Sequence, residues 1–549
     1  MTRPLRVVAA AAFAAAAVAA APAAAAHPLP RLLVAVSDPA AVPAGSERIG
    51  ELAPGIRAYS VTVPAGRDAG DFAAALRARP GIVAVQPDQR LRMAQAQSPG
   101  FCATITPTGV STVVPATVDA LGVSAPTTKP IAILDTGVDA SAPELAGRIV
   151  SPFSALDGSA DASDKDGHGT QVAGIAAARP GLFAGVSPTS PIMPIKIFQA
   201  NGEGTAEGLV KGIQTAVSRG AGIVNISGAG AAADASAPDT QVVAMAIAGA
   251  FAKGVLVVAA AGNDGSNKAF VPGDLPHVLT VGSGDPLGGR SGFSNTGPWI
   301  DLLAPGENLM PPMPPALCST GYGPANGTSF SAPAVAGGAA LVQQLRPGLT
   351  VQQLFDVLRS SAKDASVAGR DDDTGYGELD VANAVRAPLP KADPGELDDD
   401  VYWLKGPFAS QHKTLLKRGK VARVKARVSS AKDPEDVYKV YVARGQVLTA
   451  RVTGTAGALL DVTIWNRNTG NFDVSKDVAK TQLVSTGGYS QGPQVSYRAK
   501  KGGTYYVSVD TPDVPDPDED PDQVARPDEP YQLSVTRKKA RASGKKRRS

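Results

Sequence analysis

The residue with the clearest chemical potential is Ser329, within the stretch Asn326-Gly327-Thr328-Ser329-Phe330-Ser331-Ala332-Pro333. This stretch opens a run of small and apolar residues, 334–345, that predicts a buried helix. Free N–H groups and the positive end of the helix dipole favour negative charge near a hydroxyl placed there. Pro333 is expected in the first helical turn, where its missing N–H is not needed. Taken alone, the pattern also fits a simple Ser/Thr cap on a core helix.

Three further polar residues stand next to predicted elements. Asp135 follows an apolar strand, His168 lies near the start of a predicted helix, and Asn263 follows a second apolar strand. Ligand sites of parallel sheets lie at the carboxyl ends of their strands, so these side chains are expected to converge with Ser329. An imidazole could take the serine proton, a carboxylate could orient that imidazole, and an amide could stabilise the oxyanion. Jointly, the four residues predict nucleophilic catalysis at a carbonyl carbon.

The stretch from about 100 to 388 alternates apolar segments with helical patterns. Continuous Val, Ile, Leu and Ala runs are typical of a parallel sheet covered on both faces, and they predict the strands Ile131–Leu134, Ile192–Phe198, Gly222–Ile226, Val255–Ala260 and Val278–Val281. Helical patterns between them cover Gly169–Ala178, Ala206–Arg219 and Asp239–Lys253. The order predicts the α/β class with a doubly wound, mostly parallel sheet.

Length and composition indicate several folded units and no strongly charged partner. A chain of 549 residues exceeds what one hydrophobic core supports, so two or three units are expected. A net charge of +3 gives no indication of nucleic-acid binding. The two cysteines, Cys102 and Cys318, have no metal-ligand spacing.

Residues 1–26 have the pattern of a secretory signal peptide. Arg3 and Arg6 precede an apolar stretch, and three alanines form a cleavage site before His27. A membrane anchor is the weaker interpretation, because the stretch is short, and no later run is long enough to span a bilayer. A secreted protein, extracellular or associated with the cell envelope, is therefore expected. Export would permit a disulfide between Cys102 and Cys318, with two free buried thiols as the alternative.

Two smaller units flank the central stretch. Residues 27–97 predict a small α/β unit with strands Arg31–Val36, Ile56–Val63 and Ile82–Val85, and a helix over Asp71–Arg79. The pattern alone does not distinguish a stable domain from a removable pro-region. Residues 389–400 have the composition of a linker, and 401–536 predict an all-β sandwich with strands such as Val437–Val442 and Thr504–Val509.

The last residues, 537–549, form a basic tail rich in Lys and Arg. Contact with an anionic cell envelope and a disordered solubilising tail are both consistent with this composition. The β sandwich itself could bind substrate or the cell surface, or it could only stabilise the protein. The acidic, Pro-rich stretch 513–530 is most simply a solvated loop.

The central stretch, residues 98–388, resembles the subtilisin-like serine peptidases, or subtilases. The matching segments are Ile133-Leu134-Asp135-Thr136-Gly137-Val138, Asp166-Gly167-His168-Gly169-Thr170, Ala260-Ala261-Gly262-Asn263 and Asn326-Gly327-Thr328-Ser329. The resemblance implies an endopeptidase that cleaves polypeptide substrates through an acyl-enzyme. Asp135 would orient His168, His168 would act as base and acid, Ser329 would be the nucleophile, and Asn263 would complete the oxyanion hole.

The resemblance also implies that residues 27–97 are an inhibitory pro-domain, so that the protein is made as an inactive precursor, or zymogen. Segments around Val61–Gly66 and Pro80–Asp88 are similar to such modules. We expect cleavage within about Met93–Ser98, where small residues could occupy the active-site cleft. The C-terminal β domain resembles appendages of secreted bacterial peptidases.

Two departures from the family pattern concern substrate and metal. Ser227, Gly228, Ala229 and Gly262 would line the substrate, yet a larger residue is usual at Gly228, whose lack of a side chain is expected to remove a pocket wall. A catalytically weak or inactive scaffold acting as a secreted binding protein is therefore the alternative. The loop 176–183 has no side-chain oxygen, so a calcium site found there in some relatives is not expected. Structural calcium elsewhere is possible, and no cofactor is expected for the chemistry.

Overall fold

The structure is a computed structural model of the 549-residue chain. It describes residues 30–94, 102, 129–231, 240–268, 270–366, 368–389, 414–416, 421–428, 435–455, 460–466, 483–486, 492–511 and 529–539. The expected signal peptide, most of the linker 389–400 and the basic tail beyond residue 539 lie outside these residues. No helix in the described segments is both long enough and apolar enough to cross a bilayer.

The N-terminal unit is a four-stranded antiparallel sheet with one helix. The strand order is β2-β3-β1-β4, with β1 at Arg31–Val36, β2 at Glu47–Ala53, β3 at Ile56–Thr62 and β4 at Ile82–Pro87. A short 3-10 turn, η1, covers Pro39–Ala41. Helix α1, Ala69–Arg77, begins where the Asp68 carboxylate accepts a hydrogen bond from the Asp71 N–H. The sequence pattern did not predict β2, because this edge strand is mostly polar and exposed.

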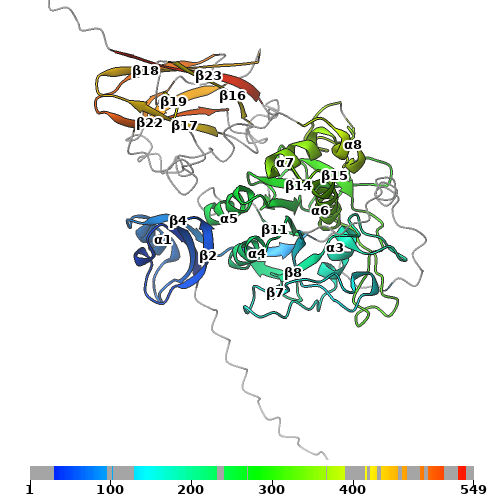
Figure 1. The fold of residues 1–549 in the computed structure, drawn as a ribbon. Helices are drawn as coiled ribbons and strands as arrows, with labels where there is room; N and C mark the ends of the chain where they lie inside the picture. Colours follow the sequence, from blue (N-terminus) through cyan, green and yellow to red (C-terminus); the bar gives the residue numbers. More distant parts are fainter. Residues whose placement is uncertain are drawn as a thin grey trace, which may run out of the picture.

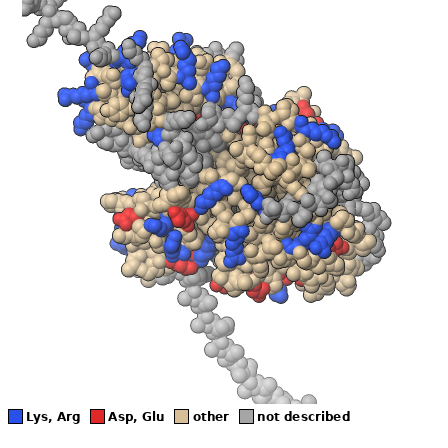
Figure 2. Space-filling view, in the orientation of Figure 1, with Lys and Arg blue, Asp and Glu red and all other residues tan. Residues whose placement is uncertain are grey.

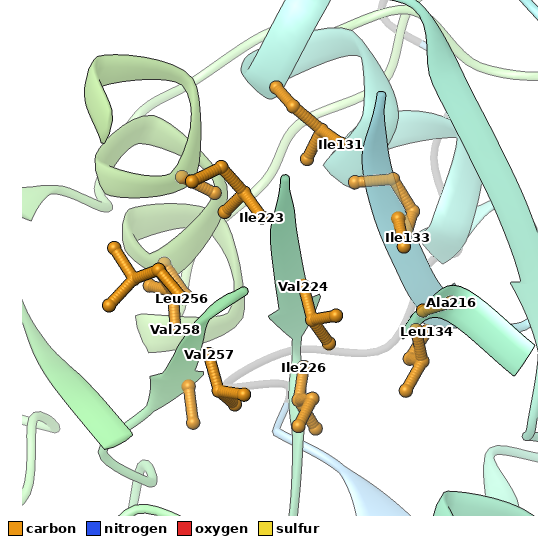
Figure 3. Close-up of a cluster of buried hydrophobic side chains, with 14 of the residues drawn as sticks. Ile131, Ile133, Leu134, Ala216, Ile223, Val224, Ile226, Leu256, Val257 and Val258 are labelled. Carbon is orange, nitrogen blue, oxygen red and sulfur yellow. The ribbon is translucent and has the colours of Figure 1, made fainter. Parts of the chain in front are cut away.

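The central domain is built on a seven-stranded parallel sheet, which confirms the predicted fold class. Its order is β15-β14-β12-β10-β6-β8-β7, with β6 at Ile131–Asp135, β7 at Phe153–Ser154, β8 at Ile192–Lys196, β10 at Ile223–Ile226, β12 at Leu256–Ala260, β14 at Val278–Gly284 and β15 at Leu302–Pro305. Side chains such as Ile133, Val224 and Val257 are fully buried between the strands and helices (Figure 3). The order of the strands reverses direction beside β6, so the carboxyl end of β6 faces a crevice.

Helices cover this sheet as two packed groups (Figure 1). Helix α3 (His168–Ala177) packs against α6 (Thr328–Leu345), and α4 (Ala206–Ser218) packs against α5 (Gln241–Ala252). Two further helices, α7 at Val351–Ser360 and α8 at Val381–Arg386, pack against α6. A 3-10 turn, η2, covers Pro143–Leu145.

Helix α6 starts earlier than the sequence pattern predicted. It begins at Thr328, so Pro333 lies past the first turn, and the expectation of a first-turn proline was wrong. A proline inside a helix cannot donate to the carbonyl four residues before it, here that of Ser329. The Ser227 hydroxyl donates to this carbonyl instead, at 2.7 Å. The proline thereby leaves the carbonyl of the expected nucleophile free to accept a hydrogen bond from the residue between β10 and β11.

A small antiparallel sheet joins the N-terminal chain to the central domain. Its order is β13-β11-β5-β9, with β5 at Arg90–Met93, β9 at Glu203–Thr205, β11 at Gly228–Ala231 and β13 at Phe270–Val271. Strand β5 lies between β9 and β11 and pairs with both. The segment after the N-terminal unit thus runs through the central domain as an added strand.

The C-terminal domain is the predicted β sandwich of two four-stranded sheets. One has the order β16-β23-β18-β21 and the other β17-β22-β19-β20. Their bounds are Val421–Val428 for β16, Glu435–Val442 for β17, Gln446–Gly454 for β18, Asp461–Trp465 for β19, Leu483–Thr486 for β20, Gln494–Arg498 for β21, Gly503–Asp510 for β22 and Glu529–Lys539 for β23. Strand β23 therefore includes Arg537–Lys539, which the sequence assigned to the tail.

Candidate active site

Asp135 and His168 form a buried hydrogen-bonded pair. Asp135 is the last residue of β6 and His168 the first residue of α3, and neither side chain is exposed to solvent. The Nδ1–Oδ1 distance is 2.7 Å. Burial lowers the pKa of His168, but the charge and hydrogen bond of Asp135, with smaller contributions from Asp166 and Asp164, raise it above its ordinary value overall. The pair therefore fixes the imidazole so that Nε2 faces away from the carboxylate.

Asp164 is a buried carboxylate that the sequence interpretation did not single out. Its Oδ1 accepts hydrogen bonds from Thr136 Oγ1 and from the Gly167 N–H, and its Oδ2 accepts from the Thr170 N–H and hydroxyl at 2.9 and 2.6 Å. These contacts tie the first turn of α3 to the residue after Asp135. The sequence did offer a sign of this role, because a carboxylate four residues before His168 can accept hydrogen bonds from the first turn of the helix.

Ser329 lies in the first turn of α6, beside the imidazole-bearing helix. The rings of His168 and Phe330 are 5.1 Å apart, and Ser329 is fully buried. Within the described part of the chain, neither Ser329 Oγ nor His168 Nε2 has a hydrogen-bond partner, although both atoms are buried. Leaving a buried hydroxyl and a buried ring nitrogen without partners costs free energy, and a catalytic role is one explanation for such atoms. A Ser329–His168 hydrogen bond is therefore not formed in this state.

Asn263 connects the start of α6 to Ala94, the residue that follows β5. Its Oδ1 accepts from the N–H and the hydroxyl of Thr328, each at 2.9 Å. Its Nδ2 donates to the Ala94 carbonyl at 2.7 Å. The neighbouring Gly262, with φ of +102°, has its N–H bonded to the Thr328 hydroxyl. Asn263 and Gly262 thus both contact Thr328, the residue next to Ser329.

Residues 90–94 lie as an extended peptide between β9 and β11. Arg92 pairs with Glu203 on one side and with the backbone of Ala229 on the other. The Met93 N–H donates to the Gly202 carbonyl at 3.1 Å, and the Ala94 N–H donates to the Ser227 carbonyl at 3.2 Å. Main-chain pairing of this kind recognises an extended chain without regard to its side chains.

The space beside Gly228, where the sequence led us to expect a missing pocket wall, is filled by another side chain. A Cβ added to Gly228 would lie 2.3 Å from Phe198 Cζ, so the Phe198 ring occupies that space. The same ring would meet a Cβ added to Gly204, at 2.6 Å. Leu91 packs over Gly230, where an added Cβ would lie 2.8 Å from it. The ring of Phe198, two residues after β8, thus fills the space that a side chain at Gly228 would need.

The N-terminal unit satisfies the free N–H groups of two helices in the central domain. Gln86 Oε1 accepts from the N–H groups of Val242 and Val243 at the start of α5, at 2.7 and 3.1 Å. Asp88 Oδ1 accepts from the Glu207 N–H at the start of α4, at 2.8 Å. Burial, with a contribution from the Glu207 charge, raises the pKa of Asp88 to about 6 despite this hydrogen bond.

The two cysteines form the predicted disulfide, with their Cα atoms 5.2 Å apart. It links Cys102 to the segment that precedes α6. In the described segments, no group of three or more His, Cys, Asp or Glu side chains is placed to hold a metal ion. The calcium expectation stays a prediction.

Known proteins match the central domain. A sequence model of the Subtilase family matches residues 128–377. The chain is 34% identical to the thermophilic serine proteinase of Bacillus sp. strain AK1 over 259 residues, 46% of this chain and 61% of that protein. It is 36% identical to alkaline elastase YaB of Bacillus sp. strain YaB over 42% of this chain and 58% of that protein.

A shorter relative is covered more completely. Subtilisin DY of Bacillus licheniformis is 34% identical over 238 residues, which are 42% of this chain and 82% of that protein. A crystal structure of a lanthipeptide protease is 28% identical, with a TM-score of 0.43, over 47% of this chain and 87% of that one. The chain spans about three fifths of the two longer relatives. From the family match and the coverage of subtilisin DY, we conclude that the chain belongs to the subtilase family of subtilisin-like serine peptidases.

Proposed function

We propose that the protein is a secreted serine endopeptidase made as a precursor that inhibits and then processes itself. The observation that carries this proposal is the 2.7 Å hydrogen bond from the Asn263 amide to the Ala94 carbonyl. An amide donor on the carbonyl of an extended peptide in the cleft is the arrangement that acyl transfer requires. The bond between Ala94 and Gln95 is accordingly the first substrate.

The two unpaired atoms, Ser329 Oγ and His168 Nε2, would carry out the nucleophilic attack and the proton transfer. Ser329 Oγ attacks the Ala94 carbonyl carbon while His168 Nε2 accepts the hydroxyl proton. The Asp135 carboxylate stabilises the imidazolium through the 2.7 Å bond to Nδ1. The bond to the Gln95 nitrogen then breaks, the imidazolium gives its proton to that nitrogen, and water hydrolyses the resulting ester.

Inhibition follows from how residues 30–94 are bound. After cleavage, the segment Arg90–Ala94 still pairs with β9 and β11 and blocks the cleft as a product. The capping contacts of Gln86 and Asp88 hold the N-terminal unit on α4 and α5. Activation therefore requires release of this unit, and the pattern of residues 1–26 supports export as the setting.

The test combines a serine-directed probe with N-terminal sequencing. The wild-type chain should label with a fluorophosphonate at Ser329 and yield a mature form that begins at Gln95. Ser329→Ala should neither label nor release residues 27–94, because the nucleophile is gone. The neighbouring Ser331→Ala is the matched control and should still label and mature.

A wild-type protein that folds but never labels would favour the alternative, a secreted binding protein on a subtilase scaffold. A mature N-terminus near His27 would contradict self-processing at Ala94. Both outcomes are read independently of any choice of external substrate.

A further inference from the structure

One sheet of the C-terminal sandwich presents an outward face of a single charge. In the sheet β16-β23-β18-β21, residues such as Ala426, Leu533, Ala450 and Val495 point inward and are buried. Side chains alternate along a strand, so their neighbours point outward. Five of the outward residues are exposed cations, which we call the basic face: Arg423, Lys425, Arg451, Arg498 and Lys538.

The basic face has no carboxylate among its described outward positions. The other outward residues are mostly hydroxyl and amide side chains, including Thr449, Ser496, Gln532 and Ser534. In Figure 2, blue atoms lie along the upper part of the C-terminal domain, where Figure 1 places β18, β23 and β16. By contrast, the N-terminal unit shows both signs on the same view.

The strand register brings the cations close to one another. Arg423 and Arg451 both lie opposite Ser534, and Lys538 and Arg498 both lie opposite Val447. Two strand spacings separate Arg423 from Arg451, about 10 Å, and two residues along β16 separate Arg423 from Lys425, about 7 Å. These separations are within or near one Debye length of about 10 Å at 0.1 M salt, so the charges repel.

Nothing described in the structure neutralises this repulsion. Arg427, at the end of the same strand, forms an ion pair with Asp356 of α7 at 3.6 Å, and so it faces the peptidase domain. The five cations of the basic face form no ion pair with any described carboxylate. Like charges held within about 10 Å of one another without a counter-charge lower stability, and an anionic ligand would remove that cost.

The residue types on the basic face favour some classes of anionic ligand over others. Its described outward positions include no aromatic side chain to stack on bases and only three apolar side chains, Val421, Val447 and Pro530. Binding of single-stranded nucleic acid and insertion into a bilayer are therefore disfavoured. Arginine forks favour phosphate oxygens, and the hydroxyl and amide side chains can bond polyol groups. A spacing of about 7 Å along a strand suits a flexible chain with one anionic group per short repeat.

We propose that the basic face binds a linear polyol polymer linked by phosphodiesters, of the kind found in anionic cell envelopes. Binding would hold the peptidase at such a surface after export. The polymer lies along β16, β23 and β18, with phosphates at the arginines and hydroxyl groups at the Ser and Thr side chains. This role is separate from the catalytic site and does not depend on peptidase activity.

The test uses the full chain with Ser329→Ala, which prevents self-digestion, and a fluorescent glycerol-phosphate polymer of about 20 repeats. Anisotropy titrations between 0.05 and 0.3 M salt compare Arg423→Gln/Arg451→Gln with Lys253→Gln/Arg386→Gln, exposed cations of the peptidase domain. The two variants change the net charge equally, and both keep the basic tail. We expect Arg423→Gln/Arg451→Gln to bind the polymer about tenfold more weakly, and the slope of log affinity against log salt to be smaller by about 1.4. The control Lys253→Gln/Arg386→Gln should lose less than twofold in affinity.

Equal losses in the two variants would show that only net charge matters and would overturn the proposal. So would tighter binding of double-stranded DNA with the same number of phosphates, or equally tight binding of anionic vesicles that carry no polymer. Lys425→Gln/Lys538→Gln is the second face variant, used if the first changes the unfolding midpoint. It should weaken binding by a similar factor.

Discussion

Two sets of buried polar contacts differ in where their partners come from. Around His168, the contacts of Asp135 and Asp164 lie entirely within the peptidase domain. At the starts of α4 and α5, the acceptors belong to the N-terminal unit, through Asp88 and Gln86. Helix N–H groups need acceptors in both places, but under the proposed function only the first set would remain once the N-terminal unit is released.

Under the proposed function, the contacts around His168 serve catalysis, and the contacts of Gln86 and Asp88 serve inhibition by the N-terminal unit. Groups in the first set should change turnover, and with it the rate of self-cleavage, while leaving the affinity of the cleaved N-terminal unit untouched. Groups in the second set should change release while leaving the turnover of the mature enzyme untouched. Asn263 belongs to both, because it binds Thr328 of the domain and Ala94 of the inhibitor strand.

The largest effect is expected at Asn263. Asn263→Ala removes one oxyanion donor, and such a loss costs roughly 10²–10³ in kcat, a range established on subtilisin itself. KM for a short peptide should change little, because main-chain pairing with β9 and β11 remains. Steady-state kinetics of the mature enzyme measure both. A loss confined to KM would place Asn263 in substrate binding only.

The next largest effect on kcat is expected at Asp164, which positions the His168 ring. Asp164→Asn removes the acceptor charge that holds the first turn of α3, and a small displacement of the imidazole can cost up to about 10²-fold in kcat. Because the Asp164 charge helps raise the pKa of His168, the acid limb of the kcat/KM profile should move to lower pH. A purely structural role would lower activity without moving that limb.

The exposed Asp161 on the same loop provides the control for this experiment. Its carboxylate accepts from the Ser163 N–H and does not contact the catalytic pair. Asp161→Asn should therefore keep both kcat and the acid limb. A shift of equal size in this variant would mean that loop charge in general, rather than Asp164, sets the pKa of His168.

The sequence predicted the parts of the fold that rest on periodicity. Continuous apolar runs such as Ile131–Leu134 located the central strands, and the motifs located the expected catalytic residues. The strand Gly228–Ala231 was not predicted, because Gly and Ala carry no hydrophobic alternation and its pairing depends on β5. The Phe198 ring filling the space beside Gly228 joins residues 30 positions apart, which no local pattern encodes.

Gln86 tests the second set of contacts. Gln86→Ala leaves the N–H groups of Val242 and Val243 without their acceptor while the interface is closed, at about 1–3 kcal/mol per buried group. Release of the N-terminal unit after self-cleavage should therefore quicken about tenfold or more. The onset of activity toward a fluorogenic peptide follows this release. The exposed Glu51→Gln, whose carboxylate bonds only within the unit, should leave the rate unchanged.

Asp88 should make release of the N-terminal unit depend on pH, and this effect on the release rate should be smaller than that of Gln86→Ala. Its pKa is about 6 in the closed interface and would return toward 3.8 once the unit is released, so the closed form binds a proton more readily. The interface is therefore strongest below pH 4 and loses that contribution as pH rises through 6. Between pH 5 and 8 the affinity should fall by up to about tenfold, since one pKa unit corresponds to about 1.4 kcal/mol.

Release rates measured across this range separate Asp88 from the rest of the interface. The Asp88→Asn side chain does not titrate in this range, so release of the N-terminal unit should lose most of its pH dependence in this variant. In Gln86→Ala, release should be faster at every pH and should keep the pH dependence. A wild-type rate that slowed as pH rose would reverse the sign of the linkage. In that case the hydrogen bond from the Glu207 N–H, which favours the charged carboxylate, would outweigh burial.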